Sequence, residues 1–201
     1  MMPRIVMALW LVGSLAAAGC GASPPSRFYT LDAVAPPSTA PAARYAVIVG
    51  PVSVPASVDR PEFVVQVAPN QVRLDEFNRW AAPLSDSIAR TVAGDLAQLL
   101  ASPDVATAPL AHFKPAYRVT ISVQRFDSID GQAAVLDAVW VVHQAASGRT
   151  DSGHTLAREA VQGTGFDALA AAHSRALATL SADVAAAIRA QPQVSPSASS
   201  R

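Results

Sequence analysis

The sequence predicts an α+β fold with a two-layer architecture, in which two helices pack on one face of a mostly antiparallel sheet. Strand-like segments come in two runs: four precede the first long helical segment, and three separate it from the second. This segregation of strands from helices is typical of α+β proteins. Because 51% of the 201 residues are hydrophobic and only 15% are charged, a folded core is favoured over intrinsic disorder.

The first residues of the chain are typical of an exported lipoprotein. An apolar run over residues 5–18 follows Arg4 and is too short to cross a hydrocarbon core as a helix, which takes about 20 residues. The small residues that lead into Cys20 resemble a bacterial lipobox, although Ala17 stands where that pattern usually has Leu. We therefore expect residues 1–19 to be a lipoprotein signal peptide and Cys20 to be lipidated. The alternative is an ordinary signal peptide with a free cysteine, but a lone exposed thiol is a liability in an oxidising compartment.

Residues 20–26 are expected to be the lipidated cysteine and a short tether of small residues and prolines. Gly21 stands where Asp would favour inner-membrane retention, so we expect an outer-membrane location facing the periplasm. Removal of Arg4 with the signal peptide leaves 14 positive and 15 negative side chains, a net charge of −1. No polybasic segment flanks Cys20 to attract anionic headgroups, so the membrane attachment would depend on the lipid.

The folded domain is expected over residues 27–190, followed by a disordered tail over residues 191–201. Its first segment, residues 27–31, predicts a short strand, and the proline-rich residues 33–43 predict a loop. If the first strand joins the sheet, the domain stays close to the membrane. If the first strand does not join the sheet, residues 21–43 form a long flexible linker.

The remaining elements follow from hydrophobic periodicity. Strands are predicted from residue 45 towards 54, over 63–67, from 72, and over 117–126, 134–143 and 154–162. A helix is predicted from Pro83 to before Pro103, with an apolar stripe that includes Leu96, and a second helix over 166–190. Phe126 is out of phase with the alternation in its strand, which indicates a bulge or the end of the strand.

Composition and motifs favour a protein without catalytic chemistry. Zero net charge removes the usual electrostatic argument for nucleic-acid binding, and a single cysteine argues against a Cys-rich zinc site. The sequence has no nucleophile elbow, no phosphate-binding loop and no metal-ligand spacing among its four histidines. His173 flanks the apolar stripe of the second helix and is expected to pack in or beside the core. We expect no enzyme activity, no cofactor and no metal.

Two features predict partner-binding surfaces. The segment 134–143 is apolar on both faces, yet two helices can cover only one face of a sheet. The other face, with Val135, Val139 and Val141, would therefore be exposed unless another chain or segment packs on it. Polar and aromatic groups suited to an interface lie at Asp59 and Arg60, and at Arg79 and Trp80. The alternatives are that Trp80 fills the core under the first helix and that the first strand and the proline loop cover the sheet.

Several segments occur together in an order that resembles the ABC-type transport auxiliary lipoprotein family. They are Cys20 and residues 27–31, 49–52, 58–61, 77–84, 117–126 and 174–177. The resemblance implies a periplasmic lipoprotein that works with MCE-domain proteins and inner-membrane transporter subunits to move phospholipid or other hydrophobic molecules between membranes. Such a role would support outer-membrane integrity, and it also suggests self-association into a homo-oligomer. The alternative is a structural or assembly lipoprotein of the cell envelope without a transport role.

Overall fold

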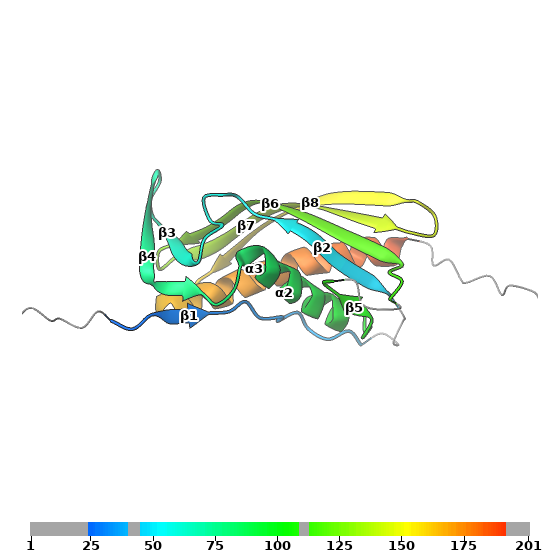
Figure 1. Cartoon of the computed structure of the whole chain (residues 1–201), viewed down its shortest axis with the longest axis horizontal. Coiled ribbons are helices and arrows are strands. Elements are labelled where there is room, and N and C mark those ends of the chain that lie inside the picture. The colour runs from blue at the N-terminus through cyan, green and yellow to red at the C-terminus, as the bar shows by residue number, and fades with distance from the viewer. Residues whose placement is uncertain (1–23, 40–44, 109–112, 192–201) are drawn as a thin grey trace, which may run out of the picture.

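The computed structural model describes residues 24–39, 45–108 and 113–191. These residues form one eight-stranded sheet and two long helices, with both helices on the same side of the sheet (Figure 1). The strands are β1 (Arg27–Tyr29), β2 (Val47–Ser53), β3 (Glu62–Ala68), β4 (Gln71–Trp80), β5 (Val105–Ala106), β6 (Tyr117–Ile129), β7 (Ala133–Gln144) and β8 (Thr150–Ala160). The helices are α2 (Leu84–Leu99) and α3 (Gly165–Ala190), close to the predicted ranges.

The sheet is mixed, and the prediction of a mostly antiparallel sheet is wrong. Its order is β1-β4-β3-β6-β2-β5, while β7 pairs with β6 and β8 pairs with β7. Among the described residues, four of the seven pairings are parallel: β1 with β4, β2 with β5, β2 with β6, and β3 with β6. The parallel pairs join strands that are far apart in the sequence, such as β2 and β6, with α2 between them. Local alternation does not reveal such pairings.

One core lies between the helices and the inner face of the sheet. The stripe of α2 is buried at Leu84, Ile88, Val92 and Leu96, and α3 adds Leu177, Leu180, Val184 and Ile188. On β6 the alternate residues Val119, Ile121 and Val123 are buried, and then the register shifts before Arg125, which returns Phe126 to the core. This confirms the bulge that the phase of Phe126 indicated.

The N-terminal segment over residues 27–38, called the strap below, is docked on the body. After β1 pairs with β4, the strap continues along the helices (Figure 1). Its backbone N–H groups donate to both helices: Asp32 to Ser174 Oγ at 3.1 Å, Ala35 to Asp95 Oδ1 at 2.9 Å, and Ser38 to the Gln98 carbonyl at 3.0 Å. The strand-docked alternative for residues 27–31 is therefore the one that the structure adopts.

Tight packing and a buried polar group hold the strap in place. A Cβ atom on Gly94 of α2 would lie 2.7 Å from the Cβ of Ala33, so only glycine lets the strap pass this close. Asp95 is fully buried and also accepts a hydrogen bond from Ser181 Oγ on α3 at 3.1 Å. One carboxylate thus ties together the strap, α2 and α3.

At the other end of the described chain, Gln191 belongs to the body rather than to the predicted tail. It is 2% exposed, and its side-chain amide donates to Asp151 at 2.9 Å. The rest of the predicted tail, from residue 192, and the signal peptide, Cys20 and residues 21–23 lie outside the described residues.

Candidate functional site

The outer face of the sheet, on the side away from the helices, carries part of the predicted apolar surface. Val139 is 40% exposed and Val141 is half-buried, whereas Val135 is only 4% exposed, so the predicted stripe is shorter than expected. Val139 pairs across strands with His154 of β8, so Leu156, two residues further on, lies on the same face and is 62% exposed.

Two polar side chains on this face of the sheet contact each other. His154 Nε2 lies 2.7 Å from a carboxylate oxygen of Asp137, the residue directly opposite Leu156. The exposed side chains of Val139 and Leu156 therefore lie beside the contact between His154 and Asp137. This arrangement suits a protein-binding surface with apolar anchors and a polar surround.

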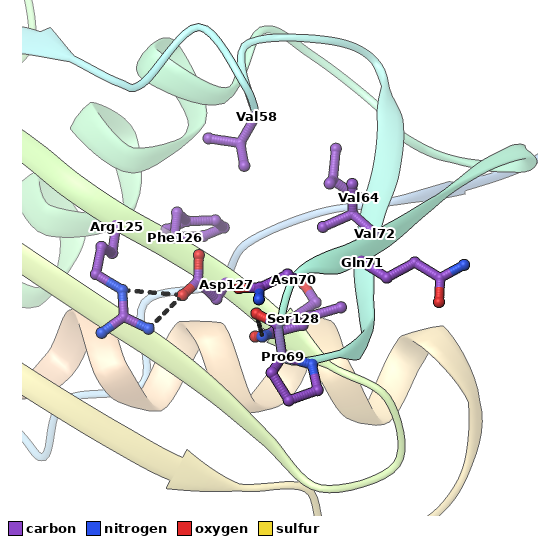
Figure 2. A pocket seen from close by; sticks show the side chains of 11 residues that line it. Val58, Val64, Pro69, Asn70, Gln71, Val72, Arg125, Phe126, Asp127 and Ser128 are labelled. Atoms are coloured by element: carbon purple, nitrogen blue, oxygen red, sulfur yellow. Dashed lines mark hydrogen bonds and ion pairs between the residues drawn. The ribbon is translucent and has the colours of Figure 1, made fainter.

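A groove of about 280 Å³ lies between the β3–β4 hairpin and β6, and we call it the hairpin groove. Figure 2 shows Val58 above it, Val64 and Val72 on the hairpin side, and Arg125 and Asp127 on the β6 side. Arg125 donates to Asp127 Oδ2 through Nε at 3.0 Å and through an Nη atom at 2.6 Å. The groove is thus lined by apolar side chains and by the Arg125–Asp127 ion pair.

The hairpin groove lies near both predicted partner-binding regions, although none of the predicted residues lines it. Val58 is next to Asp59, which is exposed, and Arg60, which is half-buried. On the other side of the groove, Arg125 is paired across strands with Asp137, which belongs to the face that carries Val139. The groove could not be predicted from the sequence, because it forms where the β3–β4 hairpin lies against β6 and no sequence motif marks it.

Arg79 lies beside the loop of Asp59 and Arg60, whereas Trp80 lies in the core. Arg79 forms an ion pair with Glu62 at 3.1 Å, directly after the loop. Trp80 is 6% exposed, and its ring stacks on Phe63 at a centroid distance of 4.1 Å. It therefore fills the core, as the alternative held, and its ring is not available as a surface anchor.

The buried polar pair between β6 and α3 shows no access to solvent. Ser128 Oγ lies 2.8 Å from His173 Nε2, and His173 is completely buried with its ring stacked on Phe126 at 3.9 Å. Burial lowers the pKa of the His173 imidazole from 6.5 to about 3, so the ring stays neutral in the folded protein. The expectation that His173 packs in the core is confirmed.

Two further findings concern the described residues only. Within residues 24–39, 45–108 and 113–191, no three or more His, Cys, Asp or Glu side chains are grouped so that they could hold a metal ion. In the same ranges, neither helix combines the length and the apolar character that a membrane span needs.

Known proteins resemble this chain in sequence and in fold. The family model described as the ABC-type transport auxiliary lipoprotein component matches residues 29–185. No curated protein matches the sequence.

Two crystal structures share the fold. One is of an uncharacterized protein, with a TM-score of 0.67 and 22% identity, and the match covers 82% of this chain and 99% of that one. The other is of a Xanthomonas campestris protein of the DUF330 family, with a TM-score of 0.64 and 21% identity, and the match covers 83% of this chain and 100% of that one.

Proposed function

Because the chain belongs to the ABC-type transport auxiliary lipoprotein family, we propose that it is the lipid-anchored accessory subunit of an MCE-type system that moves lipids between the inner and outer membranes. The family match over residues 29–185 carries this proposal. In it, Cys20 bears the lipid anchor, and the protein faces the periplasm from the outer membrane. Energy coupling and the transport path belong to its partners, the MCE-domain protein and the inner-membrane transporter subunits.

The outer face of the sheet is the surface that we assign to partner binding. Val139 and Leu156 offer exposed apolar area there, and the hairpin groove extends that area towards Asp59, Arg60 and Arg79. Exposed apolar side chains beside a groove and surrounded by polar groups are typical of protein-binding sites. We propose that this face docks on the MCE partner or on further copies of the chain in a homo-oligomer.

Copurification from the native membrane tests the proposal. The full-length protein should copurify with its MCE-domain partner, and Val139→Glu combined with Val141→Glu should abolish the association while leaving the thermal midpoint close to wild type. Ala182→Glu, at an exposed position on α3 on the other side of the molecule, is the matched control and should retain the partner. If the wild-type protein carries no MCE partner under these conditions, a structural or assembly role replaces the transport role.

The anchor is tested separately by Cys20→Ser. Because the core lies wholly downstream of residue 27, we expect the variant to fold and to leave the membrane fraction. Fractionation of cells measures this, and a variant that sediments with the outer membrane as firmly as wild type would disprove the lipid anchor.

A further inference from the structure

We propose that the sheet edge formed by β1 and the end of β4 is a second membrane contact, whose partner is a phospholipid surface. We call this edge, with Phe28 and Phe77 as its apolar side chains, the β1 edge. The inference rests on the proposed lipid anchor at Cys20. It adds that the domain has a defined orientation relative to the membrane.

The exposure of Phe28 follows from the pairing of β1 with β4, which fixes the orientation of the β1 side chains. β1 pairs with β4 in the register Phe28 opposite Arg79 and Tyr29 opposite Trp80. The Tyr29 ring packs inward against Phe63, at a centroid distance of 5.5 Å, and its hydroxyl donates to Asn78 Oδ1 at 2.7 Å. Because successive side chains of a strand point to opposite faces, Phe28 must point outward, and it is 64% exposed.

A second aromatic side chain lies at the same end of the sheet. Phe77 directly precedes Asn78, the first β4 residue that pairs with β1, and it is 38% exposed. Arg27, next to Phe28, is also exposed. Phenylalanines that enter the headgroup boundary beside an arginine that stays in water form the usual arrangement of an interfacial membrane contact.

The strap prevents the β1 edge from swinging away from the body. The N–H of Ala81, directly after β4, donates to the carbonyl of Tyr29, the last residue of β1, at 2.9 Å. Further along, the strap is held by Ser174, Asp95 and Gln98 through the three hydrogen bonds described above. The direction in which the anchored segment leaves the domain is therefore set by the fold.

The length of chain between the anchor and β1 brings this edge to the membrane. Six residues, 21–26, lie between Cys20 and Arg27, and the seven Cα-to-Cα steps between these two residues span at most about 25 Å. The membrane-embedded cysteine thus keeps Phe28 close to the bilayer, whereas β8 is separated from β1 in the sheet by β4, β3, β6 and β7. The exposed Glu76 near Phe77 and the lack of a polybasic cluster indicate an apolar contact that does not require anionic lipid.

Tryptophan quenching by brominated lipid tests this orientation. The full-length lipidated protein carrying Phe28→Trp is reconstituted into phosphatidylcholine vesicles with or without brominated acyl chains. Leu156→Trp is the matched control, because Leu156 is 62% exposed but lies on β8. The two native tryptophans of the folded body, Trp80 and Trp140, are buried and supply a constant background.

We expect brominated lipid to lower the emission of the tryptophan at position 28 about twofold, because interfacial side chains enter the bilayer by about 5–10 Å. The tryptophan at position 156 should be unaffected, and neither result should change with added salt. Equal emission of the position 28 variant in both kinds of vesicle would overturn the proposal, and a blue-shifted but unquenched spectrum would show that protein covers Phe28 instead.

Flotation of the same vesicles separates this failure from failure of the anchor. Protein that floats with the vesicles but is not quenched at position 28 disproves only the β1 edge contact. Protein that does not float disproves the anchor, and with it the orientation that depends on the anchor.

Discussion

At the scale of single residues, the environment of His173 is the most unusual feature of the core. The ring lies between Phe126, stacked at 3.9 Å, and Trp80, at a centroid distance of 6.1 Å. Its Nε2 atom contacts Ser128, while its Nδ1 atom is buried without a hydrogen-bond partner. These surroundings accept a neutral ring and exclude a charged one, which is why its pKa falls to about 3.

We expect His173 to make the fold sensitive to acid. Above about pH 6.5 the imidazole is neutral in both the folded and the unfolded chain, so it adds no pH dependence. Between 6.5 and about 3 the unfolded chain binds a proton that the folded chain refuses, so the free energy of unfolding falls as the pH falls. The slope from this one group approaches about 1.4 kcal/mol per pH unit.

Urea unfolding between pH 8 and pH 4 measures this slope, and His173→Gln is the comparison, because glutamine can still bond to Ser128 but does not titrate. Asp95 has the opposite effect on the pH dependence of stability. Burial raises the pKa of its carboxyl group, so the free energy of unfolding falls as the pH rises through this raised pKa and the buried group ionises. Asp95 is present in both proteins, so the difference between their slopes isolates His173. Identical slopes would contradict the prediction.

At the scale of elements, the strap depends on a glycine whose role is not visible in the sequence. In the middle of a helix, alanine is better than glycine by about 1 kcal/mol. Gly94 is nevertheless required because a Cβ there would come within 2.7 Å of Ala33. The helix therefore gives up some local stability to accept the strap.

We predict that Gly94→Ala stabilises α2 locally but loosens the strap. Amide hydrogen exchange at Ala35 and Ser38, whose N–H groups are bonded in the docked strap, should accelerate roughly tenfold, a change of about 1.4 kcal/mol in the local opening free energy. Exchange at Val184, in the buried face of α3, is the internal control and should not accelerate. Unchanged protection at Ala35 would show that the strap adapts to the extra methyl group.

The helices could be predicted from the sequence, but the strand pairings could not. The 3.6-residue stripe through Leu96 and the prolines on either side determine α2 locally. By contrast, the alternation in β6 shows which side chains are buried but not which strands are neighbours, and β6 pairs with β2 in parallel and with β7 antiparallel. The short β5 has too few residues to produce a pattern.

The candidate site was predictable only in part, for a similar reason. Val139 could be identified because its strand is apolar on both faces, but Leu156 lies in a segment with a weak pattern. Trp80 has the residue type of an interface anchor, and only its stacking on Phe63 shows that it is a core residue. Residue type indicates what a side chain can do, whereas its exposure depends on contacts that are distant in the sequence.

At the scale of the whole molecule, the sheet, both helices and the strap share one core. Leu96 is completely buried in the stripe of α2, and α2 contacts both α3 and β2. Since no second core is present among the described residues to stabilise part of the domain on its own, the body is expected to unfold as one cooperative unit.

We therefore predict that Leu96→Asp abolishes the folded state. An unpaired carboxylate buried in an apolar core costs several kcal/mol, comparable with the total stability of about 5–15 kcal/mol for a domain. Leu156→Asp introduces the same charge at a position that is 62% exposed, and its effect should stay within about 0.5 kcal/mol of wild type. Urea unfolding followed by circular dichroism should show a normal cooperative transition for Leu156→Asp and none for Leu96→Asp. A transition for Leu96→Asp at the wild-type midpoint would mean that α2 does not pack its stripe against the sheet, and the two-layer core would be wrong.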